Sequence, residues 1–238
     1  MPRFDEPLLT QPGKLACSEV GVAPPRQKPL PALIEPETLP LVDTNSTEKL
    51  VQLSHPKIQT LQNYRLAGWG GARPGTWLRV GAAERLYAIA HGLPDRWGLC
   101  VFDAWRPLDL QAELYDAAYS DPNLPPGFVS MPDSDPRTPP PHLTGGTVDL
   151  SLTLDDTPLA LGTGFDDFTD LARAAALETT VGVDRDLRRW LYWLMRSEGF
   201  VVLECEWWHF EYGTRRWAAI TTNAPVYGPA DAPISEVD

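Results

Sequence analysis

The stretch 142-HLTGGTVDLSLTL-154 decides the fold, because residues 147–154 alternate strictly between polar and apolar side chains. Val148, Leu150 and Leu152 share one face, and Asp149 lies on the opposite face with threonine and serine side chains. A two-residue period of this kind predicts a β-strand with its apolar face on the core. Asp149 is therefore expected to point into whatever pocket lies on the other side.

Helical and strand patterns flank this stretch in an irregular order. They predict helices over residues 77–93, 107–119 and 184–200, and strands or hairpins over residues 98–105 and 200–213. Pro107 suits the first turn of its helix, Asp184 or Asp186 is the expected N-cap of the third, and Gly199 ends it. A mixture without regular βαβ spacing favours an α+β domain.

The chain of 238 residues suits one large domain with extensions. Prolines crowd residues 1–45, which predicts an irregular arm that wraps the domain or docks a neighbouring subunit of a homo-oligomer. The folded domain is expected over residues 46–222, with a loop-like tail over 223–238. Residues 120–141 hold eight prolines and predict a long loop leading to His142.

Composition excludes several partners. A net charge of -12 argues against nucleic acid and anionic membranes, since both require a basic surface. The N-terminal residues lack the pattern of a signal peptide and no stretch is apolar enough to span a bilayer, which predicts a cytoplasmic protein. Three widely spaced cysteines fit a reducing compartment, with Cys100 and Cys205 expected in the core. The expected partner is a small substrate.

Two segments carry the residues of a metal site. His142 and Asp149 lie seven residues apart, and Gly145 and Gly146 between them permit a turn that brings both to one point. His209 supplies a second imidazole. Two histidines and one carboxylate are the ligand set of many catalytic zinc sites, which keep a further position for water. The pattern predicts a hydrolase with one zinc ion per chain.

The segment 205-CEWWHFEYG-213 adds a proton carrier to this set. Glu206 precedes His209 by three residues, which suits a general base rather than a fourth ligand. Residues three apart point to opposite sides of a regular strand, so we expect an irregularity at Trp207 and Trp208. The two tryptophan rings are expected to wall the site and to raise the pKa of Glu206 by desolvation.

With these residues in place, the chain resembles the zinc D-alanyl-D-alanine dipeptidase family, which includes the vancomycin-resistance dipeptidases. The family patterns SxHxxGxAxD and ExWH are similar to 140-PPHLTGGTVD-149 and 206-EWWH-209. An arginine-proline element matches at Arg106, and a glycine-threonine, phenylalanine-aspartate loop matches at residues 162–166. The resemblance covers roughly residues 60–215. It implies the fold of the D,D-peptidase and hedgehog group, in which helices pack on a small antiparallel sheet.

The resemblance implies a role for each matched residue. The metal would be held by His142, Asp149 and His209, with Glu206 moving the proton. Arg106 is expected to hydrogen-bond the oxyanion of the tetrahedral intermediate. Asp166 is expected to pair with the free ammonium group of a dipeptide, and Trp208 to line the substrate pocket. The implied reaction is hydrolysis of a small D,D-dipeptide, most simply D-Ala-D-Ala, from peptidoglycan metabolism of the cell wall.

Two departures from the family pattern keep other functions open. Pro140 stands where the pattern has serine, and Thr147 where it has alanine. The alternatives are a zinc D,D-carboxypeptidase that accepts longer wall peptides, and a zinc-stabilised binding module of the same fold without turnover. An iron(II) oxygenase also uses two histidines and a carboxylate, but its first histidine and acid are usually two residues apart. That class fits poorly.

Other polar residues have simpler interpretations. His91 is expected at a helix end, His55 in a loop, and Asp167 and Asp170 in solvated or capping positions. Glu211 is expected on the outer rim of the site. Arg106 has a structural alternative in an ion pair with Asp103 or Glu113.

Overall fold

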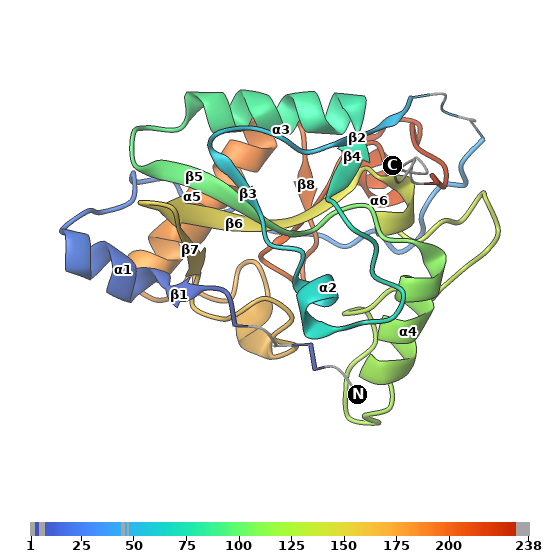
Figure 1. Ribbon diagram of the computed structural model, residues 1–238, viewed down its shortest axis with the longest axis horizontal. Helices are drawn as coiled ribbons and strands as arrows, with labels where there is room; N and C mark the ends of the chain where they lie inside the picture. Colours follow the sequence, from blue (N-terminus) through green and yellow to red (C-terminus); the bar gives the residue numbers. More distant parts are fainter. Residues whose placement is uncertain (1–2, 5–7, 44–45, 47, 232–238) are drawn as a thin grey trace.

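The computed structural model describes residues 3–4, 8–43, 46 and 48–231, and Figure 1 shows how their helices and strands are arranged. The helices are α1 (Gly13–Val20), α2 (Asn63–Ala67), α3 (Val80–Gly92), α4 (Leu108–Ala118), α5 (Val183–Ser197) and α6 (Arg215–Thr221). The strands are β1 (Gln11–Pro12), β2 (Leu50–Gln52), β3 (Ile58–Thr60), β4 (Trp77–Arg79), β5 (Trp97–Asp103), β6 (Thr147–Leu154), β7 (Thr157–Ala160), β8 (Val201–Val202) and β9 (His209–Glu211). The α+β class expected from the sequence is confirmed.

Strand β6 is the centre of the main sheet. It pairs antiparallel with β5 on one edge and with β7 and β9 on the other, and β8 pairs antiparallel with β9. Two outer strands differ from the expected antiparallel arrangement, since β3 pairs parallel with β5 and β1 pairs parallel with β7. Figure 1 shows α3 along one side of this sheet and α2 and α4 on the opposite side.

The alternation of residues 147–154 does form the predicted strand, and both of its faces are buried. Its leucines and Val148 are almost inaccessible to solvent and pack in the main hydrophobic core. The polar face is buried as well, and Ser151 Oγ donates a hydrogen bond of 2.6 Å to the carbonyl oxygen of Leu159. Burial of Asp149 on this face therefore requires partners, because an unpaired carboxylate is costly in such surroundings.

The register of the strands places three polar residues in one row across the sheet. Asp149 of β6 is directly opposite Asp103 of β5 and directly opposite His209 of β9. An irregularity between Val101 and Asp103 shifts the register of β5 at this end. The row lies where β5 ends, so the residues that follow Asp103, including Arg106, start from the same place.

Helix α5 begins differently from the sequence prediction. Its N-cap is Gly182, with Asp184 and Asp186 inside the first turn, so the expected cap was wrong. The Asp184 carboxylate instead accepts a hydrogen bond of 3.1 Å from the backbone N–H of Lys14, in the first turn of α1. It caps a neighbouring helix because α1 packs against α5. Gly199 has a φ of +84°, which suits the end of a helix as expected.

The first 45 residues contain more regular structure than their prolines predicted. Strand β1 and helix α1 lie in this part of the chain, whereas residues 23–40 form neither helix nor strand. The irregular segment is tied to the domain by Arg215, whose guanidinium donates to the carbonyl oxygens of Leu39 and Pro40. The boundaries placed near residues 45 and 222 stay predictions.

The other predicted loops hold in the described part of the chain. Residues 120–141 have no helix or strand, as expected. In the tail, Tyr227 is buried and Arg79 donates to the carbonyl oxygens of Gly228 and Pro229, while residues 232–238 lie outside the described residues. None of the helices described here has the length and hydropathy that crossing a bilayer would require.

Candidate active site

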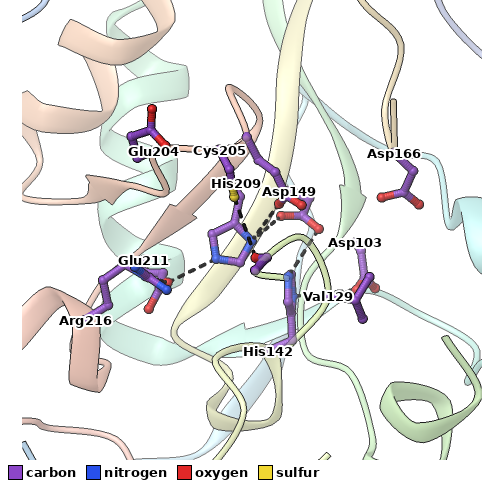
Figure 2. Close-up of polar contacts among 12 residues, drawn as sticks. Asp103, Val129, His142, Asp149, Asp166, Glu204, Cys205, His209, Glu211 and Arg216 are labelled. Atoms are coloured by element: carbon purple, nitrogen blue, oxygen red, sulfur yellow. Dashed lines mark hydrogen bonds and ion pairs between the residues drawn. The ribbon is translucent and has the colours of Figure 1, made fainter. Parts of the chain in front are cut away.

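Three side chains from two motifs meet at the row across the sheet. His142, from a short 3₁₀ turn before β6, presents Nε2 to Asp149 Oδ2 at 3.2 Å, and His209 presents Nδ1 to Asp149 Oδ1 at 3.0 Å. Figure 2 shows both imidazoles turned toward this carboxylate. One ligand atom from each residue lies within 4.8 Å of the others, and all three side chains are buried. The ligand set expected from the sequence is thus assembled in space.

In each imidazole, the far nitrogen, which faces away from Asp149, also has a hydrogen-bond partner. His142 Nδ1 lies 2.7 Å from the carbonyl oxygen of Ala104, which can only accept, so Nδ1 carries the proton. His209 Nε2 lies 3.1 Å from Glu211 Oε1, and a carboxylate likewise favours a protonated Nε2. The nitrogens that face Asp149, Nε2 of His142 and Nδ1 of His209, are then the lone-pair nitrogens that a metal ion needs.

The surroundings of the three ligands favour a cation. Asp149 Oδ1 has no hydrogen-bond partner among the described residues, although His209 Nδ1 lies beside it. Burial by itself lowers the pKa of His209, but Asp149 and Glu211 outweigh it and raise that pKa to about 10. An excess of negative charge at a buried point is what a divalent metal would offset. Two imidazoles and a carboxylate fit zinc by ligand type.

Glu206 lies beside this ligand set and outside it. The chain turns over residues 203–208 between β8 and β9, which confirms the predicted irregularity, and Glu206 Oε2 comes to 3.6 Å from His209 Nδ1. Burial raises the pKa of Glu206 to about 8, with an opposing contribution from His209 and a further increase from Asp149. A carboxyl group with a pKa near neutrality can both take and return a proton.

Arg106 faces the ligand set from the end of β5. Its Nε donates to Asp103 Oδ2 at 2.8 Å and its Nη1 to Gln111 Oε1 at 2.9 Å, so the expected pair with Asp103 forms. Nη2 is held more loosely, at 3.4 Å from Tyr64 Oη and 3.6 Å from Asp149 Oδ2. Glu113 instead accepts hydrogen bonds from the backbone of Gly70 and Gly71. The guanidinium is thereby fixed with one corner toward the metal ligands.

Asp166 and Arg106 both contact the buried hydroxyl group of Tyr64. Tyr64 Oη donates to Asp166 Oδ2 at 2.9 Å and lies next to Arg106 Nη2. Burial raises the pKa of Asp166 well above its usual range, and the charges of Glu206 and Asp149 raise it further. Tyr64 was not identified from the sequence, because 42 residues separate it from Arg106 and only the tertiary fold joins them.

These groups line one cavity. Among its lining residues are His142, Asp149, His209, Glu206, Arg106, Asp166, Tyr64 and Ser130. Phe4 also lines it, and the Phe4 ring lies 5.1 Å from both Trp69 and Phe168. The free volume of the cavity is about 20 Å³, well below the roughly 300–1,000 Å³ typical of small-molecule sites.

The two tryptophans do not line this cavity. Trp208 is fully buried and packs against Phe165, while Trp207 donates from Nε1 to Thr163 Oγ1 at 2.8 Å. They pack beneath the residues of the site, so the expectation that Trp208 lines the substrate pocket was wrong. Pro140 and Thr147, the two departures from the family pattern, are buried and also lie outside the lining.

Glu211 was placed wrongly by the sequence analysis. It is 1% exposed rather than on the rim, and it contacts His209, Thr214 and Arg216. The signal was available, because residues two apart on a strand share a face and Glu211 is two residues after His209. Cys100 is buried as expected, whereas Cys205 is partly exposed.

Comparison with known proteins identifies the family of this chain. Residues 81–226 match a family model described as D-ala-D-ala dipeptidase. A D-alanyl-D-alanine dipeptidase of Synechocystis sp. is 28% identical over 199 residues, which cover 69% of this chain and 78% of the relative. A D-alanyl-D-alanine dipeptidase of Escherichia coli K12 is 32% identical over 114 residues, which cover 48% of this chain and 54% of the relative. The family match spans more than half of the chain, including the three candidate metal ligands, so this protein belongs to the D-Ala-D-Ala dipeptidase family and is a metallopeptidase.

Proposed function

We propose that this protein is a zinc-dependent dipeptidase that cleaves a small D,D-dipeptide, most simply D-Ala-D-Ala, into free amino acids. The observation that carries the proposal is the single small cavity that contains the metal ligands together with Glu206, Arg106 and Asp166. The two relatives are both D-alanyl-D-alanine dipeptidases, which supports the choice of substrate.

In this proposal His142, Asp149 and His209 hold the zinc ion. When bound there, zinc supplies Lewis-acid chemistry, polarising a carbonyl group and making water more acidic. Glu206 takes a proton from the attacking water and returns it to the leaving amine. Its pKa of about 8 suits both steps near neutral pH.

Arg106 would stabilise the negative charge that develops on the carbonyl oxygen. Nε and Nη1 are committed to Asp103 and Gln111, which leaves Nη2 as the donor nearest to Asp149. A donor held in place before the reaction needs no reorganisation as charge develops. Burial by itself lowers the pKa of Arg106, but Tyr64, Asp103 and Asp149 outweigh it and raise that pKa, so the guanidinium stays charged.

Asp166 would bind the free ammonium group of the substrate. Its carboxylate lies in the cavity and bonds to Tyr64 rather than to a cationic side chain. A substrate ammonium group beside this carboxyl group would favour its ionised form and pair with it, and a peptide whose amine is blocked lacks that group. This arrangement favours a free dipeptide over the longer peptides of a carboxypeptidase.

The test is release of D-alanine by zinc-loaded protein from D-Ala-D-Ala, from N-acetyl-D-Ala-D-Ala and from L-Ala-L-Ala. Cleavage of only the free D,D-dipeptide is expected. Cleavage of the acetylated peptide at a similar rate would indicate a carboxypeptidase. Stoichiometric zinc without any cleavage would indicate a binding module of the same fold.

A matched metal experiment addresses zinc itself. Protein stripped with a chelator is expected to lose activity and to regain it on addition of one equivalent of zinc per chain. Restoration by manganese or iron(II) with no response to zinc would overturn the choice of metal.

A further inference from the structure

The second contact of His209 distinguishes it from His142. The far nitrogen of His142 is hydrogen-bonded to a backbone carbonyl and lies 3.6 Å from Asp103 Oδ2, whereas that of His209 lies 3.1 Å from the carboxylate of Glu211. Both His209 and Glu211 are almost completely buried, at 4% and 1% exposure. A buried carboxylate of this kind needs more than one donor to offset its desolvation.

Glu211 has those donors. Arg216 Nε donates to Oε1 at 2.8 Å, the same oxygen that faces His209 Nε2, and Thr214 Oγ1 donates to Oε2. Thr214 also caps helix α6, since its hydroxyl accepts from the backbone N–H of Trp217. Both carboxylate oxygens therefore accept hydrogen bonds from residues at the start of α6. Figure 2 shows Glu211 between His209 and Arg216.

The irregular N-terminal segment reaches the outer end of these contacts. Arg216 Nη1 forms an ion pair with Glu35 Oε2, and Glu35 Oε1 accepts a hydrogen bond of 2.9 Å from the backbone N–H of Glu204. The side chain of Glu35 is 37% exposed and that of Arg216 is 17% exposed. The contacts thus run from a partly exposed acid through Arg216 and Glu211 to His209.

We propose that Glu211 is a positioning residue that keeps the proton of His209 on Nε2 and turns Nδ1 toward the metal, with Thr214 and Arg216 fixing Glu211 and Glu35 anchoring Arg216. The inference rests on the metal site of the proposed function, but it does not depend on which peptide is cleaved. A carboxylate behind a metal-bound histidine fixes the orientation and tautomer of the ring, and its removal typically lowers metal affinity about 10- to 100-fold.

The test measures zinc affinity by competition with a chelating dye, and the ¹⁵N shifts of the His209 ring in zinc-loaded protein. Glu211→Leu is expected to weaken zinc binding about 10- to 100-fold, and Glu211→Gln, which keeps an acceptor oxygen, by a smaller factor. The wild-type ring is expected to show a protonated Nε2 and a metal-bound Nδ1. Zinc affinity of Glu211→Leu within twofold of the wild type would overturn the proposal, as would a protonated Nδ1 in the wild type.

Milder variants cover the case in which Glu211→Leu fails to fold. Thr214→Val removes one donor to Glu211, and a reduction of zinc affinity smaller than that of Glu211→Gln is expected. The matched control is Glu204→Gln, because Glu204 also pairs with an arginine, Arg173, without touching His209. Equal zinc affinity in Thr214→Val and Glu204→Gln would contradict the role of Thr214.

Glu35 is tested against Glu37, an exposed acid on the same segment. Glu35→Gln is expected to weaken zinc binding by less than about threefold, and the effect should shrink at high salt because the pair is partly exposed. An effect no larger than that of Glu37→Gln would remove the N-terminal segment from the proposal. All these measurements read metal binding, so they remain informative if peptidase activity is absent.

Discussion

Asp149 and His209 stand directly opposite each other on β6 and β9, with Oδ1 of the aspartate 3.0 Å from Nδ1 of the histidine. Asp103 on β5 completes the same row. Backbone hydrogen bonds between strands therefore set the distance between two of the three proposed metal ligands. A slip of one residue in register would move His209 to the other face of the sheet. Only His142 depends on a loop for its position.

The metal ligands can be tested with the other histidines as controls. His142→Ala is expected to abolish stoichiometric zinc binding, because two ligands remain of three. His91→Ala is expected to bind zinc as the wild type does, since His91 is exposed in the last turn of α3. Zinc content by atomic emission after gel filtration checks both variants. Normal zinc content in His142→Ala would rule out the ligand set.

Glu206→Gln separates proton transfer from metal binding. The glutamine has nearly the same shape but cannot exchange a proton, so turnover is expected to fall about 10²- to 10⁴-fold. Zinc content should stay at one per chain. Glu204→Gln, two residues earlier and paired with Arg173, is the control and should leave turnover unchanged. Equal losses of zinc and turnover in Glu206→Gln would identify Glu206 as a ligand instead.

Arg106→Lys keeps the charge but loses the planar group that binds Asp103 and Gln111 together. We expect kcat to fall about 10²- to 10³-fold with little change in KM or in zinc content. The control is Arg96→Lys, because Arg96 makes a similar two-point contact with Asp155 at the surface. A rise in KM with unchanged kcat would assign Arg106 to substrate binding rather than to the oxyanion.

The sequence predicted the parts of this site that are encoded locally. His142, Asp149, Glu206 and His209 lie in two short motifs, and the alternation around Asp149 correctly indicated a strand. The turn before His209 followed from the spacing of Glu206. These features depend on residues at most seven positions apart.

The remaining parts depend on tertiary contacts. Tyr64 reaches Asp166 across 102 residues, and no local pattern marks that hydrogen bond. Asp184 looked like an N-cap of its own helix, but α1 packs nearby and takes its carboxylate. Glu211 shares a face with His209. It was expected on the rim because charged side chains are rarely fully buried.

Phe4 offers a test of why the cavity is small. Its ring packs between Trp69 and Phe168 and lines the cavity that holds Asp166. Phe4→Ala would remove this cover, so cleavage of N-acetyl-D-Ala-D-Ala should rise relative to cleavage of the free dipeptide. Steady-state kcat/KM for both peptides measures the ratio. Phe128 also packs against Phe168 and lines the same cavity, so Phe128→Ala shows whether any loss of an aromatic ring there has this effect. An unchanged ratio in Phe4→Ala would exclude Phe4 from size selection.

Asp166→Asn should stabilise the protein and weaken substrate binding together. The folded pKa of Asp166 is raised by burial above the unfolded value of about 3.9, so the unfolded chain releases the proton first as the pH rises. The stability of the wild type therefore falls, relative to Asp166→Asn, from about pH 4 up to the folded pKa. Urea unfolding at pH 4 and pH 8 should show a difference that grows with pH.

The same substitution removes the proposed partner of the substrate ammonium. A hydrogen bond to a charged group contributes about 1.5–3 kcal/mol, which corresponds to a KM for the free dipeptide about 10- to 100-fold higher in Asp166→Asn. Asp167→Asn, one residue later and partly exposed, should change neither stability nor KM. A stability gain without any change in KM would show that Asp166 is buried for a structural reason, and the ammonium would then need another partner in the cavity.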